Sequence, residues 1–424
     1  MQSSQEPSTG PRTGPLSHVR VLDLSRILAA PWAGQILADL GAEVIKVEKP
    51  GAGDDTRAWG PPFLKDAEGR DTREAGYYLA VNRGKRSITL SLDKPEGQRI
   101  VRELAMRADI VLENYKAGTL ERYGLDAASL RKINPRLIYC SVTGFGQTGP
   151  YAPKPAYDFI LQGLAGPMST CGLPDDQPGG GPMRTAIPMT DMVTGLYATI
   201  GILGALMHRQ KTGEGQAIDA AMLDATVAFN GHLAVGYLMS GKAPQRVGNT
   251  NPIASPSEVF DCADGRIIIA AGNNGQFQQL CAVLGAPDMS ADPRFATNTD
   301  RVRHRDALVP LIEAETRKRS TAQWIALLEH RAVPCGPINT VAQAFEDAQV
   351  KARQLVVEQP LTAAATAQTG IASIASVASP LRLLDTPPVL HRAPPALGEH
   401  TDEVLAGLGQ DVAAIAALRE KGVV

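Results

Sequence analysis

The sequence predicts an α/β fold, in which an open parallel sheet carries helices on both faces and a second, smaller α/β unit follows. Two observations lead to this prediction. Apolar stretches typical of strands alternate with amphipathic stretches typical of helices over the first 143 residues. The chain also has 424 residues, of which 44% are hydrophobic and 20% charged, and this is enough for two separate cores.

The first predicted elements form a βαβ unit. Residues 19–25 (VRVLDLS) are predicted as a strand, residues 31–42 as a helix and residues 43–48 (EVIKVE) as a second strand. The short connections between them suit a right-handed crossover that joins parallel strands. The alternation then continues with a strand at 87–92, a helix at 95–108, a strand at 109–115, a helix at 130–133 and a strand at 137–143.

Later stretches predict more helix than strand. A long apolar helix begins near Thr190 or Asp191 and ends before Gly213. The second unit is predicted from a helix at 219–239, a strand at 265–272 and several amphipathic helices up to about 332. An extended return segment at 360–396 and helical residues at 401–422 then follow.

Composition limits the class of protein. The formal charge of −2 gives no general attraction to nucleic acid or to an anionic membrane. The first fifteen residues have no apolar core of a secretion signal, and the apolar tract at 193–207 is too short to span a bilayer, so we expect a cytoplasmic protein. The five cysteines show no metal-ligand spacing and are expected as buried thiols in a reducing compartment: Cys140, Cys171, Cys262, Cys281 and Cys335.

Three loops directly follow predicted strands, after Ser25, Tyr115 and Thr143, and ligands of open α/β sheets bind at that end of the strands. The third loop contains GxGxxG at 144–149. A dinucleotide site would need a helix directly behind these glycines, but the prolines of PYAPKP (150–155) prevent one. We therefore expect the glycines to shape a tight loop.

The strongest candidate for chemistry is Asp191, at the start of the long apolar helix. Thr190 or Asp191 can be the N-cap that satisfies free backbone amides. Alternatively, the amides and dipole at the helix start keep the Asp191 carboxylate ionised, so that it can act as a nucleophile. Asp158 is likewise either a residue of the site or a structural one, and in the second case it is a surface carboxylate or the cap of the following helix. The basic residues of NRGKRS (82–87), with Lys46, Lys49, Arg57 and Arg122, form either a solvated turn or a phosphate site.

A series of segments, in this order, resembles the class III CoA-transferases, the family of formyl-CoA transferase and carnitine CoA-transferase. The resemblance extends from about Leu16 to Val424 and is based on VLDLSRILAAPWAGQILADLGAEVIKVEKPGAGD, NRGKRSITL, VLENYKAGTLERYGLD, NPRLIYCSVTGFGQTGP, AYD, MTD, KTGEGQAIDAAMLDA, VPCGPINT and LGEHTDEVL. Within the family, PGAGDDTRAWGPPF, YYLAVNRGKRSI and AAGNNGQF are most similar to succinate–hydroxymethylglutarate CoA-transferase and related dicarboxylate enzymes.

The resemblance implies a homodimer of two interlocked chains, each threaded through a hole in the other. Within each chain it implies a Rossmann-like large domain built from both chain ends. The expected boundaries are 16–215 for the first part of the large CoA-binding domain, 216–247 for a linker helix, 248–343 for a small domain and 344–424 for a return segment.

The resemblance also implies that Asp191, in the MTD motif, is the catalytic nucleophile. Its carboxylate would attack an acyl-CoA thioester and give an aspartyl–acyl anhydride, which the released thiolate converts to an aspartyl-CoA thioester. An acceptor carboxylate then takes over the CoA, and water must be excluded because the anhydrides hydrolyse. Acyl-CoA and a free acid are the substrates, with no tightly bound cofactor and no metal. We expect succinyl-CoA as donor and a C4 to C6 dicarboxylate as acceptor.

The residues expected beside CoA or the acyl group follow from the same resemblance. They are Leu28, Ala29, Lys49, Leu90, Asn114, Tyr115, Lys116, Arg122, Tyr157 and Asp158. Lys49 and Arg122 are expected to meet phosphates. Formyl-CoA transferase differs at Arg26, Leu28 and Asp93, so its substrate contacts do not carry over.

Two alternatives accompany this prediction. An α-methylacyl-CoA racemase would share the fold but needs a histidine before Asp158, where this chain has Tyr157, whose reference pKa of about 10 suits proton exchange poorly. A catalytically silent CoA-binding homologue is the other. Arg184, seven residues before Asp191, is either a clamp for the distal carboxylate of a dicarboxylic acyl group or a surface arginine.

Overall fold

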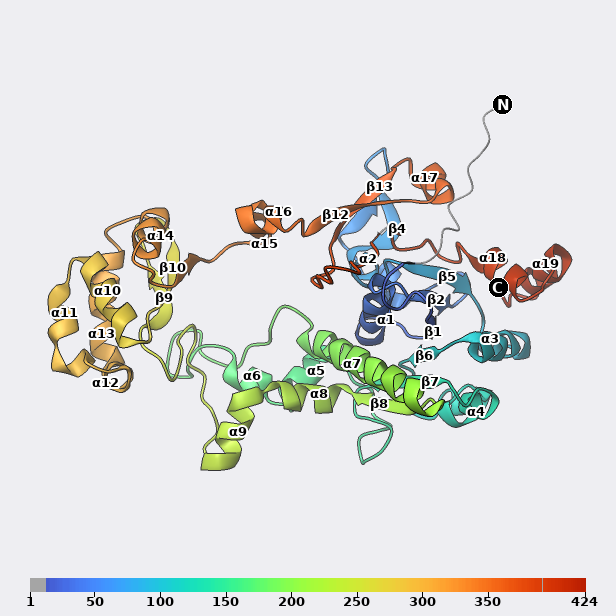
Figure 1. Cartoon of the computed structure of the whole chain (residues 1–424), viewed down its shortest axis with the longest axis horizontal. Coiled ribbons are helices and arrows are strands. Elements are labelled where there is room, and N and C mark those ends of the chain that lie inside the picture. Colours follow the sequence, from blue (N-terminus) through green and yellow to red (C-terminus); the bar gives the residue numbers. More distant parts are fainter. Residues whose placement is uncertain (1–12, 391) are drawn as a thin grey trace. The chain divides into compact units, whose positions relative to one another are not determined.

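The computed structural model describes residues 13–390 and 392–424, so most of the first fifteen residues lie outside its described part. The chain divides into two compact units. The larger unit contains the chain up to Gly166, then Thr185–Val235 and Lys351–Val424, and the smaller contains Pro167–Arg184 and Gly236–Val350. The larger unit is therefore assembled from both ends of the chain (Figure 1).

A six-stranded parallel sheet forms the centre of the larger unit, in the order β5-β2-β1-β6-β7-β8. Its strands are β1 (Arg20–Asp23), β2 (Glu43–Glu48), β5 (Lys85–Thr89), β6 (Ile110–Glu113), β7 (Ile138–Thr143) and β8 (Ala217–Ala221). The chain runs outward from β1 to β5 and then returns to the other side of β1. Strands β1 and β6 therefore flank the switch point at which open sheets bind ligands.

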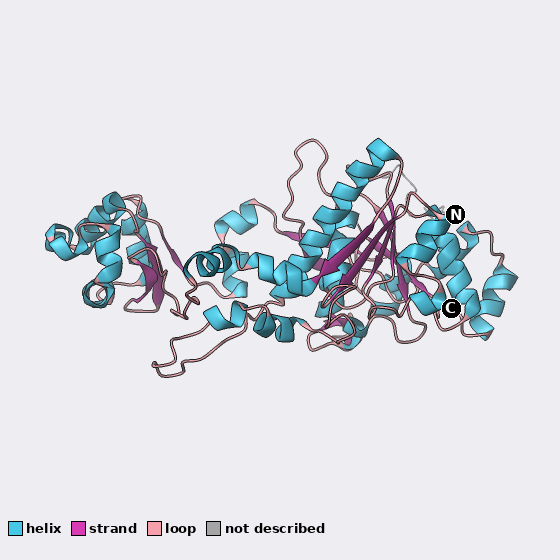
Figure 2. Cartoon of the chain, turned by 90° about the horizontal axis from the view of Figure 1, so that it is seen from below, coloured by secondary structure: helices cyan, strands magenta, loops and turns pink. Residues whose placement is uncertain are grey.

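Alternating side chains of these strands build two cores, one on each face of the sheet. Leu22, Leu24 and Val111 pack with α3 (Pro95–Arg107), α4 (Ala127–Ile133), α18 (Thr401–Gly407) and α19 (Val412–Glu420). Val21, Val44 and Ile110 pack with α1 (Ala29–Asp39) and α7 (Met189–Thr212). Figure 2 shows helices on both sides of the six strands. The predicted parallel sheet with helices on both faces is confirmed.

The helix predicted at 219–239 is wrong. Residues 217–221 form β8, the edge strand, which pairs in parallel with β7. The helical stretch begins only afterwards, as α8 (Met222–Phe229) and α9 (Gly231–Ser240), which are separated at Gly231, where φ is +54°. Alanine-rich AIDAA has a weak strand propensity, and its pairing with β7 decides its conformation.

Among the described residues, α7 alone is long and apolar enough to cross a membrane by length and composition. The apolar tract at 193–207 is the middle of this helix, which polar residues at both ends extend to 24 residues. Half of its most apolar window is buried, and it packs against α1 and β7. It is a core helix of the larger unit.

The C-terminal segment is tied to the first part of the chain. The carbonyl of Pro395 accepts hydrogen bonds from Arg57 and Tyr78, and His400 N–H donates to the carbonyl of Ser87 in β5. The remaining elements of the larger unit are η1 (Asp55–Ala58), β3 (Phe63–Lys65), β4 (Asp71–Ala75), α2 (Gly76–Val81), η2 (Glu121–Tyr123), α5 (Asp158–Leu164), β12 (Val356–Pro360), α17 (Ala363–Thr369) and β13 (Ser373–Val377).

The smaller unit has its own core around an antiparallel sheet, β11-β10-β9. Its strands are β9 (Ser257–Asp261), β10 (Arg266–Ala270) and β11 (Cys335–Pro337). Its helices are α6 (Pro167–Thr170), α10 (Asn274–Leu284), α11 (Pro287–Ala291), η3 (Pro293–Phe295), α12 (Asn298–Arg303), α13 (Arg305–Thr316), α14 (Thr321–Glu329) and α15 (Val341–Glu346), and α16 (Ala348–Ala352) crosses the boundary between the units.

A fully buried arginine, Arg301, ties the loops of the smaller unit together. Its guanidinium lies 4.6 Å from the Phe277 ring centre and donates to the carbonyls of Ser255 and Gly272, both at 2.7 Å, and of Phe295 at 3.0 Å. Burial lowers the pKa of Arg301. These carbonyls supply the hydrogen bonds that a buried cation needs.

Candidate active site

Asp191 lies in the first turn of α7, but it does not cap that helix. The N-cap position is Pro188, and no side chain of the cap residue bonds the helix amides. The backbone N–H of Ala29, the first residue of α1, instead faces the Asp191 carboxylate and favours its ionised form. The N-cap interpretation of Thr190 or Asp191 is therefore wrong.

Helix α1 needs an acceptor at this point. Its N-cap residue, Leu28, provides no side-chain hydrogen bond, and Pro31 has no N–H. The first helical bond runs from Trp32 N–H to the carbonyl of Leu28 at 2.8 Å, so Ala29 and Ala30 carry the amides that precede it. The Asp191 carboxylate occupies the anion position that this helix start favours.

The pKa of Asp191 is raised from 3.8 to about 7. Burial is the larger cause, the negative charge of Asp158 is the second, and the N–H of Ala29 acts in the opposite direction. A carboxylate with this pKa is more basic than an exposed one and still ionises near neutral pH. Perturbed carboxylates of this kind are typical of functional sites.

Asp158 fixes the start of α7. Its Oδ1 accepts the backbone N–H of Thr190 at 2.8 Å and the Thr190 hydroxyl at 2.7 Å, while Oδ2 accepts Nε2 of buried Gln162 at 2.7 Å. Both earlier alternatives, a surface carboxylate and a cap of its own helix α5, are wrong, because Asp158 caps the helix that carries Asp191. Tyr157, directly before it, is 58% exposed.

Gly195, one turn after Asp191, lets α1 approach α7 closely. A Cβ at this position would lie 2.6 Å from the carbonyl oxygen of Ala29 and 2.9 Å from Trp32 Cδ1. Any side chain here would push the backbone of Ala29 away. The absence of a side chain at Gly195 therefore permits the contact between Ala29 and Asp191.

The loop between β1 and α1 contains a strained residue. Ile27 has φ of +72°, a left-handed conformation that is a rare outlier for a β-branched side chain. Such a conformation costs about 1–3 kcal/mol and persists only when the surroundings enforce it. Asn114, which follows β6, bonds both backbone groups of Arg26: Oδ1 accepts its N–H at 2.8 Å and Nδ2 donates to its carbonyl at 2.6 Å.

The residues expected beside CoA lie mostly at one edge of the sheet. Leu28 and Ala29 are buried at the start of α1, Lys49 follows β2, and Leu90 follows β5. Asn114, Tyr115 and Lys116 follow β6, and the guanidinium of Arg26 lies 5.4 Å from the centre of the Tyr115 ring. Because all six strands are parallel, these positions share the carboxyl edge with Asp191's partner, Ala29. Arg184 is exposed.

Most of the predicted phosphate cluster is unavailable to phosphates. Four of its cations are buried and each is paired with a carboxylate: Lys46 with Asp54, Arg57 with Glu48, Arg83 with Asp39 and Lys85 with Asp23. The phosphate interpretation is therefore wrong for these four residues. Lys49 and Arg122 are exposed cations.

The glycine loop after β7 has the expected tight geometry. A Cβ on Gly144 would lie 2.1 Å from the Ala156 Cβ, so the two ends of the loop touch. Turns follow Gly149, and the next helix, α5, begins at Asp158. This arrangement excludes the dinucleotide alternative, and the loop leads to Tyr157 and Asp158.

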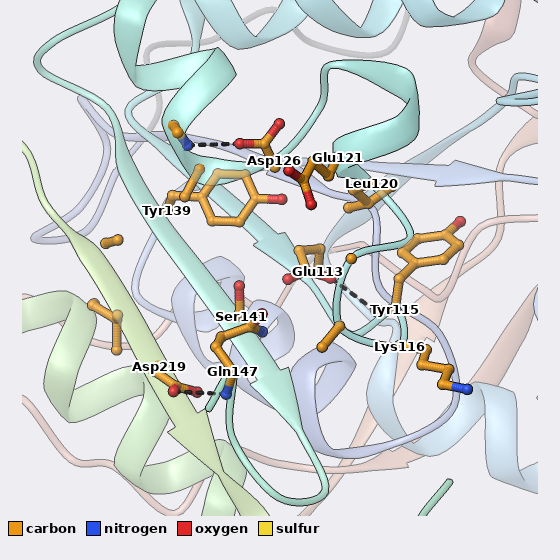
Figure 3. A pocket seen from close by; sticks show the side chains of 16 residues that line it. Glu113, Tyr115, Lys116, Leu120, Glu121, Asp126, Tyr139, Ser141, Gln147 and Asp219 are labelled. Carbon is orange, nitrogen blue, oxygen red and sulfur yellow. Dashed lines mark hydrogen bonds between the residues drawn. The ribbon is translucent and has the colours of Figure 1, made fainter. Parts of the chain in front are cut away.

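A cavity of 440 Å³ lies over β6, β7 and β8 beside Tyr115 and Lys116. Figure 3 shows Glu113 and Ser141 between Tyr139 on one side and Asp219 and Gln147 on the other. Burial raises the pKa of Glu113 to about 7, and the charge of Asp219 adds to this effect. Four carboxylates line the cavity against the single ammonium of Lys116, so it disfavours phosphate groups: Glu113, Glu121, Asp126 and Asp219.

Comparisons with known proteins agree on one family. A family model described as CoA-transferase family III matches residues 16–401. The chain is 48% identical over 397 residues to a succinate–glutarate CoA-transferase of Agrobacterium fabrum, covering 94% of this chain and 96% of that protein. It is 39% identical over 411 residues to a succinyl-CoA:glutarate CoA-transferase of Homo sapiens, covering 97% and 90%. A CAIB/BAIF family protein from Brucella suis matches with a TM-score of 0.83 and 45% identity, covering 94% of this chain and 100% of that one.

Proposed function

The chain belongs to CoA-transferase family III and is a class III CoA-transferase, and from this premise we propose that it moves CoA from succinyl-CoA to a free dicarboxylate through Asp191. The observation that carries the proposal is the contact between the Asp191 carboxylate and the Ala29 N–H at the start of α1. It combines a partly desolvated nucleophile with a fixed donor. Ala29 follows β1, one of the two strands that flank the switch point of the sheet.

In the first half of the reaction, an Asp191 oxygen attacks the thioester carbonyl of succinyl-CoA. The carbon–sulfur bond breaks, CoA leaves as the thiolate, and a mixed anhydride forms. The thiolate then attacks the carboxyl carbon of Asp191, which releases succinate and leaves an aspartyl-CoA thioester. In the second half, the acceptor carboxylate attacks this thioester and repeats the two steps in reverse, so that every intermediate stays activated.

The Ala29 N–H stabilises charge during these steps. When the carboxyl carbon of Asp191 is attacked, its oxygen becomes an oxyanion, and a backbone donor already aimed at that oxygen needs no reorganisation. Losing one such donor typically costs about 10²–10³ in rate. The raised pKa of Asp191 also favours its acylation, because the acylated side chain no longer carries a charge beside Asp158.

The substrate classes follow from the relatives whose names contain succinate and glutarate. We assign a C4 to C6 dicarboxylate as acceptor and Arg184 as the cation that binds its distal carboxylate, since a guanidinium binds carboxylates in a bidentate manner. Arg184→Ala should lose its preference for dicarboxylates over monocarboxylates of equal length. Unchanged selectivity would remove Arg184 from the site.

Positions at the carboxyl edge support the assignment of the CoA contacts. Tyr115 and Lys116 follow β6, and the exposed cations Lys49 and Arg122 are proposed to bind phosphates. The proposed apolar walls of the site are Leu28 and Leu90, with Ala29, Asn114, Tyr157 and Asp158 contributing polar contacts near the acyl end.

We also propose the interlocked homodimer for this chain, with activity in the reducing cytoplasm. An apolar face on α5 and α7 supports association, because Ile160, Leu164, Leu196, Ile200 and Met207 are 48–62% exposed. All five cysteines are free thiols, which suits a reducing compartment.

The test of the function combines exchange with capture of the intermediate. Purified protein with succinyl-CoA and glutarate should form glutaryl-CoA, and mass spectrometry should find CoA attached to the peptide containing Asp191. Asp191→Asn should abolish both, whereas the control Asp306→Asn, in the first turn of α13, should retain both. Exchange by Asp191→Asn, or deuterium uptake at the α-carbon in heavy water without transfer, would contradict the proposal.

A further inference from the structure

The strained turn at Ile27 has a second brace besides Asn114, a buried ion pair. The Ile27 N–H points at both oxygens of Asp54, at 3.2 Å each. Asp54 pairs with Lys46 at 2.8 Å, and neither side chain is exposed at all. Lys46 also donates to the carbonyl of Ser25 at 2.8 Å.

The two braces, together with Asp23, fix every backbone polar group from the Ser25 N–H to the Ile27 N–H. The Ser25 N–H donates to Asp23 at 3.0 Å, its carbonyl accepts Lys46, both groups of Arg26 bond Asn114, and the Ile27 N–H bonds Asp54. Two residues later comes Ala29, whose N–H meets Asp191. The position of this donor is therefore set by the braced turn.

A simpler role for Asp54 does not explain these contacts. Asp54 is the N-cap of η1, where its Oδ1 accepts the Thr56 N–H at 3.0 Å. Capping accounts for that bond but for neither the Ile27 contact nor the bond from Lys46 to Ser25. A buried ion pair is also weak support for stability, because apolar side chains often serve as well.

We propose that the Lys46–Asp54 pair is a positioning element for CoA transfer, which holds Ile27 at its left-handed φ so that the Ala29 N–H faces the oxyanion formed on Asp191. Asn114 serves the same purpose from the β6 side. The inference rests on the proposed function, because it needs Asp191 as the nucleophile. Neither Lys46 nor Asp54 touches substrate in this proposal.

The experiment measures how fast the aspartyl-CoA adduct forms in a single turnover at saturating succinyl-CoA. The double variant Lys46→Met/Asp54→Asn removes both buried charges and should slow the adduct at least tenfold, since a displacement of about 1 Å can cost 10²-fold. Adding Ile27→Gly to the double variant should raise the rate of adduct formation at least threefold, because glycine adopts positive φ without strain. Ile27→Gly alone should form the adduct at a rate within threefold of that of the parent.

The matched control is Asp55→Asn, which changes the neighbouring carboxylate that bonds the Arg26 side chain at 3.0 Å but no backbone group of the turn. Asp55→Asn should form the adduct at a rate within twofold of that of the parent. If the double variant does not fold, Asn114→Ala with and without Ile27→Gly replaces it. Because Asn114 is also proposed to contact the acyl group, rescue of the rate by Ile27→Gly, which a lost substrate contact would not permit, then decides the question.

The positioning role would be overturned if the double variant, or Asn114→Ala in its place, formed the adduct at a rate within twofold of that of the parent. It would also be overturned if Ile27→Gly did not rescue the rate. A parent protein that forms no adduct at all would instead refute Asp191 as the nucleophile, so the two failures are distinguishable.

Discussion

The close approach of α1 to α7 gives a prediction that separates packing from chemistry. In Gly195→Ala, the new methyl group would lie 2.6 Å from the Ala29 carbonyl oxygen, about 0.8 Å short of the 3.4 Å of ordinary contact. The start of α1 must retreat by a comparable distance. Because a misplacement of about 1 Å can cost 10²-fold, we expect kcat to fall roughly ten- to 100-fold.

The stability of Gly195→Ala should change much less than its activity. Alanine gains about 1 kcal/mol of helix propensity over glycine, while overpacking costs about 1–3 kcal/mol. We therefore expect the free energy of unfolding to fall by at most about 2 kcal/mol. CoA exchange between succinyl-CoA and glutarate, followed by chromatography, gives kcat, and urea unfolding gives the stability.

Gly201→Ala is the control on the same helix. Its Cβ would lie 3.5 Å from Ile218 Cγ2, an ordinary contact distance, so kcat should stay within twofold and stability should not fall. Parent-like kcat in Gly195→Ala, or an equal loss in Gly201→Ala, would refute the reasoning that Gly195 sets the position of the Ala29 amide.

Two further predictions concern a charge near the site and a buried cation of the smaller unit. For the parent, kcat/KM should rise with pH through about 7, because only ionised Asp191 attacks. In Asp158→Asn this rise should move to lower pH, because the charge of Asp158 is one cause of the raised pKa of Asp191. Burial should still keep the pKa of Asp191 above 3.8. An unmoved or upward-shifted limb would contradict the coupling. Arg301→Met should lower the free energy of unfolding by about 3 kcal/mol, because buried carbonyls lose their donor, whereas exposed Arg303→Met should change it by less than about 0.5 kcal/mol. Equal unfolding curves for the two variants would exclude the structural role of Arg301.

The sheet was predictable because its strands have strong local signals. EVIKVE is β2 from its first residue to its last, and the apolar LIYCSVT contains β7. Strand β8 was missed because AIDAA lacks β-branched bulk except for Ile218, and only its pairing with β7 makes it a strand. The start of α7 was placed correctly by Pro188 and the following apolar run.

The site was predictable in its residues but not in its contacts. The sequence indicated that Asp191 lies at the start of a helix. Its carboxylate, however, faces the start of a different helix, α1, which begins 162 positions earlier. No local pattern shows that Asp158 caps α7 or that Asp54 reaches Ile27. Of the glycines in α7, Gly195 alone lies against the backbone of α1, and the sequence does not distinguish it from Gly201 and Gly204. The positive charges of Lys46 and Lys85 also suggested a phosphate site. Their burial against Asp54 and Asp23 depends on the tertiary structure, and the sequence does not show it.

The hydrogen bonds from Arg57 and Tyr78 to Pro395, and the place of Val404, Leu405, Ile415 and Leu418 in the sheet's core, have a consequence for biosynthesis. Helices α3 and α4 cover this face of the first-made strands only in part, and the rest stays uncovered until residues 401–420 have been made. The nascent chain can bury that surface only after residues 401–420 have left the ribosome, and holdase chaperones are expected to protect it until then.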